Sequence, residues 1–149
     1  MKRLLILTAL ITASVAACTT MKSGTIGSEG LSQLTGVWEM NHISGPRIAF
    51  NGLYPGKVPI IEFNTREKKF SGNTSCNSFS GTLVADDSTI SFNEPLIMTK
   101  MACPGEGEAT FIQTLQKVNT YSVSNDTTLY FMMGDIVIMR FIKKNSGTP

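Results

Sequence analysis

Three cysteines carry most of the chemistry that this sequence could perform. Cys18 ends an apolar N-terminal run, whereas Cys76 and Cys103 lie well inside the chain. A cysteine thiol can be acylated, can form a disulfide, or can bind a thiophilic metal ion. The segment around each cysteine indicates which of these reactions applies.

The segment that ends at Cys18 resembles the signal peptide of a bacterial lipoprotein. A positive start precedes an uncharged apolar run over residues 4–17, and this run is shorter than a bilayer span, which needs about 20 residues. The run ends in Val15-Ala16-Ala17-Cys18, which is similar to a lipobox. We therefore expect residues 1–17 to be a signal peptide and Cys18 to be the site of lipidation, because two or more acyl chains hold a protein stably on a membrane. An ordinary secretory signal with an Ala-x-Ala cleavage site is the alternative.

Residues 18–33 are small, polar and rich in glycine, so they predict a flexible tether between the lipid and a folded domain. Thr19, rather than Asp, follows the cysteine. The sorting rule known for some Gram-negative bacteria then favours the outer membrane. We expect a protein of the cell envelope that contacts the membrane through its lipid anchor, on either the periplasmic or the surface face.

Charge argues against a nucleic-acid partner. Lys2 and Arg3 leave with the signal peptide, so the 13 basic residues become 11 (13 − 2) against 11 acidic residues. The remaining chain is near neutral and has no basic stripe of the kind that neutralises phosphates. Residues 34–143 are expected to form one domain of ordinary size, and residues 144–149 a disordered tail.

Cys76 and Cys103 would lie in an oxidising compartment after export, so a disulfide is possible. Its closed loop of about 28 residues would contribute on the order of 3.5 kcal/mol in the chain-entropy model. Two buried free thiols, or a metal pair, are the alternatives. Two thiolates without further placed ligands make a poor zinc site, and His42 is the only histidine. We expect no metal.

No residue pattern indicates catalysis or a cofactor. His42 is alone on an expected strand, and the adjacent Asp86 and Asp87 are typical of a turn. Glu106 and Glu108 are explained by the electrostatics of a helix start. The glycine-rich loop near Cys76 lacks the Lys-Ser/Thr ending of a phosphate-binding loop. The chain is therefore interpreted as a protein without enzymatic activity.

Strand patterns dominate the domain, with a hairpin expected around Gly134-Asp135. One helix is expected over residues 106–118, because apolar residues there recur at helical spacing. The fold class is mainly β with one helix: a small antiparallel, lipocalin-like β-barrel, or a curved sheet covered by the helix. The expected strands cover residues 37–43, 58–63, 69–72, 79–84, 89–92, 128–132 and 136–141.

The most distinctive stretch is the loop over residues 71–81, which is rich in Gly, Asn and Ser. Only Cys76 and Phe79 in this loop are expected to enter a core. The polar residues are expected to be exposed and to form an interaction surface: Asn73, Ser75, Asn77 and Ser78.

Three spaced motifs resemble the META/HslJ domain family, from about Leu34 to Ile142. The family's Gly-x-x-Gly-Cys-Asn-x-Phe-x-Gly loop, its Thr-x-Met-Ala-Cys segment and its Glu-x-x-Phe-x-x-x-Leu helix occur here in the right order. One departure is Ser75, which stands where the family usually has Gly. The matching residues are Gly72, Cys76, Asn77, Phe79 and Gly81; Thr99, Met101, Ala102 and Cys103; and Glu108, Phe111 and Leu115.

The resemblance implies a lipocalin-like barrel with a helix, and an envelope protein linked to stress tolerance without an established enzymatic activity. It also implies that Cys76 and Cys103 are spatial neighbours, because both fall on recurrent cysteine positions of the family. The expected function is a non-catalytic module that binds an envelope protein or a small ligand. The alternatives are a structural stress protein without a ligand and a small periplasmic inhibitor.

Overall fold

The computed structural model describes residues 29–144. The expected signal peptide, Cys18, most of the expected tether and residues 145–149 lie outside the described residues. The elements are α1 (Glu29–Gln33), β1 (Gly36–Ile43), α2 (Phe50–Leu53), β2 (Ile60–Asn64), β3 (Lys69–Asn73), β4 (Ser78–Thr82), β5 (Val84–Ala85), β6 (Ile90–Ser91), β7 (Ile97–Met98), α3 (Gly107–Leu115), β8 (Thr120–Ser124), β9 (Thr128–Met133) and β10 (Ile136–Lys144).

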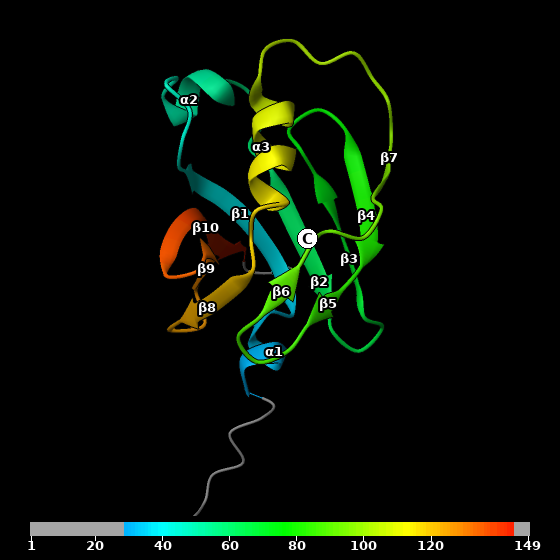
Figure 1. The fold of residues 1–149 in the computed structure, drawn as a ribbon. Helices are drawn as coiled ribbons and strands as arrows, with labels where there is room; N and C mark the ends of the chain where they lie inside the picture. Colours follow the sequence, from blue (N-terminus) through cyan, green and yellow to red (C-terminus); the bar gives the residue numbers. More distant parts are fainter. Residues whose placement is uncertain (1–28, 145–149) are drawn as a thin grey trace, which may run out of the picture.

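Most strands belong to one antiparallel sheet of eight strands in the order β7-β4-β3-β2-β1-β10-β9-β8 (Figure 1). The mainly-β class and the antiparallel arrangement are therefore confirmed. The sheet is not closed into a barrel, because its end strands β7 and β8 do not pair. After Thr82 the chain leaves the sheet, and β5 pairs with β6 instead. One isolated bridge, Thr89 to Thr120, links this small sheet to β8.

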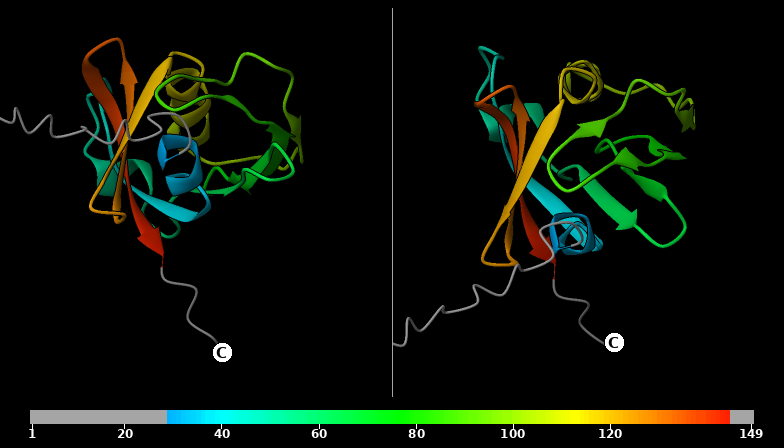
Figure 2. Two further views of the ribbon diagram at one scale, coloured as in Figure 1. Left: turned by 90° about the horizontal axis from the view of Figure 1, so that it is seen from below. Right: turned by 60° about the horizontal axis from the view of Figure 1, so that its bottom comes forward.

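The sheet bends into two halves, with α3 seated in the opening between them (Figure 2). The expected helix is confirmed, although it is shorter than residues 106–118. Phe111 and Leu115 are completely buried. Their spacing of four residues places both on the helix face that meets the core.

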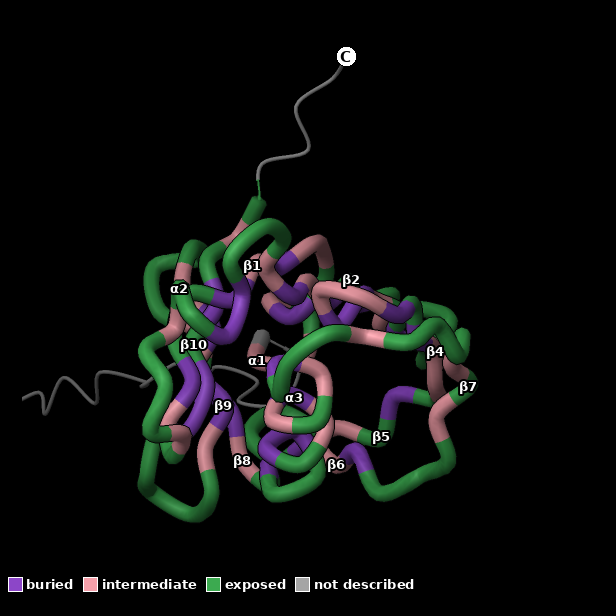
Figure 3. The backbone as a smooth tube through the Cα atoms, turned by 90° about the horizontal axis from the view of Figure 1, so that it is seen from above, coloured by how far each residue is buried: buried purple, intermediate pink, exposed green. Residues whose placement is uncertain are grey.

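Phenylalanine rings fill the space between the two halves, and buried residues follow β1, β9 and β10 in Figure 3. Phe79 meets Phe111 of α3 with ring centroids 5.7 Å apart. From Phe79 the ring contacts continue through further phenylalanines to the other half of the sheet. These rings are Phe70, Phe92, Phe131 and Phe141.

The domain begins earlier and ends later than the sequence indicates. Residues 29–33, assigned to the tether, form α1, and Leu31 packs against the core. Leu34 accepts a 2.7 Å hydrogen bond from the indole of Trp38, which fixes the start of β1. Lys144, assigned to the tail, is the last residue of β10 and pairs with Val37.

Three further elements were not expected: β7, β8 and α2. β7 has only two residues, too few for a pattern. β8 pairs with β9 along its whole length. Within residues 29–144, no helix has both the length and the apolar character needed to cross a membrane.

Tyr121 ties β8 to the loop before β6. Its hydroxyl donates a 2.6 Å hydrogen bond to the carbonyl of Asp86, and its ring is buried. Burial, with smaller contributions from the charges of Asp87 and Asp86, raises the pKa of Tyr121 well above its usual value. The folded protein therefore keeps this proton at a pH where the unfolded chain loses it, so stability falls as the pH rises above about 10.

We expect Tyr121→Phe to lower the free energy of unfolding by about 1 kcal/mol, because the Asp86 carbonyl loses its donor. The free energy of unfolding should also fall less steeply above pH 10 in this variant. It should still fall in part, because burial also raises the pKa of Tyr54, to about 12. Urea unfolding across this pH range measures both effects. Tyr130→Phe, on a half-buried tyrosine, is the control and should change stability by less than about 0.5 kcal/mol.

Candidate functional site

The loop between β3 and β4 does not form the expected exposed surface. Asn77 is 1% exposed, Thr74 is completely buried and Asn73 is 9% exposed. Ser75 is half-buried, and only Ser78 of the expected contact residues is exposed. The expectation was wrong for Asn73 and Asn77, because polar side chains can be buried where every donor and acceptor finds a partner.

Asn77 makes such a complete set of hydrogen bonds. Its side-chain oxygen accepts from the Thr99 hydroxyl at 2.7 Å and from the Met101 amide at 2.8 Å. Its side-chain nitrogen donates to the Met101 carbonyl and to Glu108 Oε1, both at 3.1 Å. One side chain thus joins the β3–β4 loop to the segment after β7 and to α3.

Glu108 completes the cluster from the first turn of α3. Its Oε2 accepts from the Thr74 hydroxyl at 2.5 Å and from the Asn77 backbone amide at 3.3 Å. Bonds from neutral donors to a charged carboxylate are the stronger class of hydrogen bond in proteins. From the sequence, Glu108 was expected only to interact with the dipole at the start of the helix, although the family's helix motif contains this residue.

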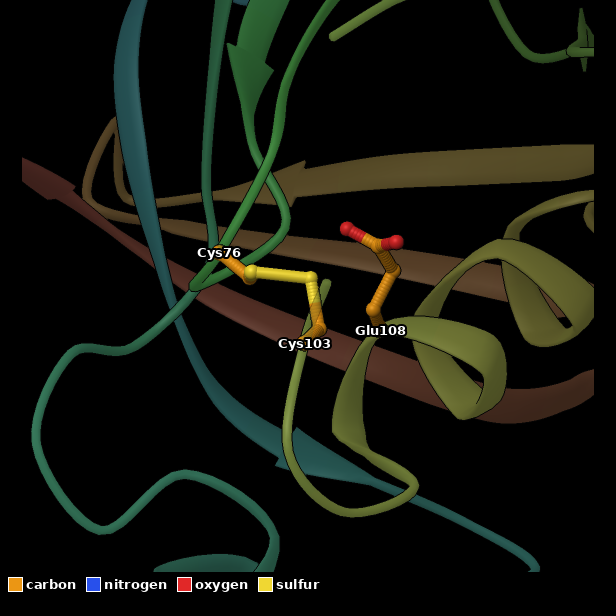
Figure 4. A group of neighbouring side chains, drawn as sticks. All are labelled: Cys76, Cys103 and Glu108. Atoms are coloured by element: carbon orange, nitrogen blue, oxygen red, sulfur yellow. A yellow bond between two sulfur atoms is a disulfide. The ribbon is translucent and has the colours of Figure 1, made fainter. Parts of the chain in front are cut away.

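Cys76 and Cys103 form a disulfide beside this cluster, with Cα atoms 6.0 Å apart (Figure 4). The nitrogen of the Asn77 side chain lies 3.1 Å from Cys103 Sγ. The disulfide and the hydrogen bonds therefore connect the same segments: the β3–β4 loop and the chain before α3.

Ser75, where the sequence departs from the family motif, has a φ of +89°. This backbone region favours glycine, because a Cβ atom crowds the following carbonyl there. A glycine would adopt this φ without steric cost, whereas the serine here adopts it at a cost in free energy. Asn73 supports the turn by accepting a 2.9 Å bond from the Ser75 amide.

The outer face of β2, β3, β4 and β7 carries a shallow groove of about 660 Å³. A second hollow of about 550 Å³ shares Glu62, Ser71, Ser80 and Ile97 with it, so the two form one continuous groove. Small serine side chains line its middle, and Ile97 of β7 is 76% exposed beside them. Ser78, one of the expected contact residues, lines the groove, and Asn73 lines it from a buried position.

The other candidate residues serve local structure. His42 is exposed on β1 and lies 3.2 Å from the Ser44 hydroxyl. Asp86 accepts bonds from the amides of Ser88 and Thr89 and from the Thr89 hydroxyl, which lower the pKa of its carboxyl. These bonds close the turn that the sequence predicted at Asp86 and Asp87.

The fold is a mainly-β domain in which hydrogen bonds join helix α3 to the β3–β4 loop, and the β3–β4 loop to the segment after β7. The chain belongs to the META domain family, whose profile matches residues 32–146. The expected family resemblance is thereby confirmed. No curated protein matches the chain significantly.

Two solved structures share the fold. The NMR structure of a protein from Burkholderia xenovorans is similar with a TM-score of 0.60 and 19% identity, over 78% of this chain and 87% of that one. The crystal structure of a DUF4847 family protein from Bacteroides vulgatus has a TM-score of 0.52 and 16% identity, over 75% of this chain and 96% of that one. At these identities the likeness concerns the fold alone.

We expect Ser75→Gly to raise the free energy of unfolding by about 1 kcal/mol, because glycine adopts positive φ without steric cost. Urea unfolding of the variant and of the wild type measures this change. Ser75→Ala is the matched control, since it removes the hydroxyl but keeps the Cβ atom, and it should bring no gain. An equal gain from both variants would show that the backbone conformation is not the cause.

Proposed function

We propose that the chain is an envelope lipoprotein, anchored through Cys18, whose META domain is a non-catalytic binding module in tolerance of envelope stress. The observation that carries the binding role is the groove beside β7. The anchor and the outer-membrane location rest on the N-terminal sequence, and the link to stress on the family resemblance. The proposed partner is an envelope protein that presents an extended segment.

The edge of β7 supports a partner with extended backbone. β7 stands at the end of the strand order, so one of its edges pairs with no other strand of residues 29–144. An extended segment can add to such an edge by backbone hydrogen bonds, while neighbouring pockets select its side chains. Ile97 of β7 is 76% exposed and offers apolar contact area at this edge, and Met101, three residues after the strand, is 61% exposed.

The charged residues of the groove favour a partner segment that carries both apolar and charged side chains. Lys57 and Glu62 both line it, so it presents a cation and an anion beside the apolar Ile97. Charge pairs at the rim of an interface contribute more to specificity than to affinity. The proposed partner segment therefore carries an apolar side chain flanked by charged ones.

A structural stress protein without a ligand is the second candidate. The closely connected phenylalanine core and the disulfide favour it, because both stabilise a small domain without any partner. The two candidates differ in one respect that can be measured: only the binding module needs Ile97.

Photo-cross-linking in intact cells tests the proposal, with the cross-linking side chain at Ser78 in the groove. A dominant partner should be recovered from the wild type, and Ile97→Glu should reduce its yield roughly tenfold, equivalent to about 1.4 kcal/mol of binding free energy. Ile136→Glu is the matched control, because Ile136 is 63% exposed on the β9–β10 hairpin and does not line the groove. It should leave the yield unchanged.

The anchor is tested separately with Cys18→Ala, which should move the protein out of the membrane fraction. If no cross-linked partner depends on Ile97, the binding role is wrong and the structural candidate replaces it. If Cys18→Ala stays in the membrane fraction, the lipid anchor is wrong, whatever the cross-linking result.

A further inference from the structure

Three potential metal ligands meet at the start of α3. Cys76 Sγ, Cys103 Sγ and a carboxylate oxygen of Glu108 all lie within 4.8 Å of one another, and all three residues are half-buried (Figure 4). No metal was expected from the sequence, because two thiolates had no further placed ligand. The structure places a carboxylate oxygen of Glu108 beside both sulfurs.

We propose that Cys76, Cys103 and Glu108 bind a thiophilic divalent cation of the zinc type when the disulfide is reduced. A dithiol reductant first transfers two electrons and two protons to the disulfide and itself becomes a disulfide. The cation then displaces the two thiol protons and binds two thiolates and one carboxylate. A water molecule completes four-coordination, as in zinc sites with three protein ligands.

The backbone geometry allows this change without unfolding. Zinc–sulfur bonds of about 2.3 Å at tetrahedral angles place two sulfurs about 3.8 Å apart. The Cα atoms of Cys76 and Cys103 are 6.0 Å apart, so rotation of the two side chains can separate the sulfurs to this distance. The hydrogen bonds of Asn77 hold the surrounding segments together independently of the disulfide.

Neighbouring polar groups already orient the proposed ligands. Thr74 and Asn77 bind the two oxygens of Glu108 and fix its carboxylate. The side-chain nitrogen of Asn77 lies 3.1 Å from Cys103 Sγ and 3.9 Å from Cys76 Sγ, where a thiolate could share one of the two N–H groups that now bond Met101 and Glu108. Such outer contacts commonly change metal affinity 10- to 100-fold.

The disulfide and the cation compete for the same two sulfur atoms. In the oxidised cluster neither Cys76 nor Cys103 is a free thiolate, whereas in the reduced cluster both can be. The redox state of Cys76 and Cys103 then decides whether the cluster binds metal, and bound metal would protect the thiolates from oxidation. This inference is independent of the groove and of the proposed partner.

Anaerobic titration with Co²⁺ alone, which reports thiolate ligation by a charge-transfer absorption band, tests the proposal on the purified chain. The reduced chain should bind one Co²⁺ with this band, and the oxidised chain should show no band. Glu108→Gln should weaken binding at least about tenfold. Glu106→Gln is the matched control, because Glu106 is an exposed carboxylate two residues earlier and should not change binding.

The single variants Cys76→Ser and Cys103→Ser keep the test decisive if Glu108→Gln fails to fold. Each should retain the far-ultraviolet circular dichroism of the reduced wild type and lose most of the charge-transfer band. The proposal is overturned if the reduced chain shows no band, or if it loses its strand signal before Co²⁺ is added. Equal Co²⁺ binding by the Glu108→Gln and Glu106→Gln variants would also overturn it.

Discussion

The buried side-chain amide of Asn77 is the contact on which the arrangement around α3 depends. Its oxygen accepts two hydrogen bonds and its nitrogen donates toward Met101 and Glu108. A buried amide in this position is stable only if all partners are present, since each unpaired polar group costs about 1–3 kcal/mol. The loop after β3, the segment after β7 and the start of α3 are therefore held in one arrangement.

The hydrogen bonds of Asn77 also hold strand β7 in place, because they bind the residues that follow its C-terminal end. The pairing of β7 with β4 involves only two residue pairs, which is little for an edge strand. The hydrogen bonds that the Asn77 side-chain oxygen accepts from Thr99 and Met101 lie directly after β7 and add the missing support. The groove beside Ile97 is thus formed by a strand that the buried cluster positions.

The sequence predicted the helices and strands in which apolar residues recur at helical spacing or form β-rich runs around a turn. Helix α3 was expected because Phe111 and Leu115 recur at helical spacing, and the β9–β10 hairpin because Gly134 separates two β-rich runs. The sequence left a closed barrel and a curved sheet covered by the helix as alternatives, because the choice depends on where β4 leaves the sheet and on the short β7. Neither feature has a local pattern.

The sequence identified the residues of the site but not how they are arranged in space. The family motifs contain Asn77, Glu108 and both cysteines, yet a polar loop is usually exposed, so Asn77 was placed on the surface. Its burial follows from partners 22–31 residues away along the chain, which no local pattern contains. Ser75 was noted from the sequence only as the one departure from the family's glycine, and its positive φ is a finding of the structure.

A double-mutant cycle between Asn77→Ala and Glu108→Ala, measured by urea unfolding, tests the central claim most directly. We predict a coupling free energy of at least about 1 kcal/mol, because the two side chains share one buried network. The control cycle pairs Asn77→Ala with Glu67→Ala, which lies before β3 at its opposite end, and should be additive. Additivity within about 0.5 kcal/mol for Asn77 and Glu108 would contradict the claim that their buried contact holds this end of the domain together.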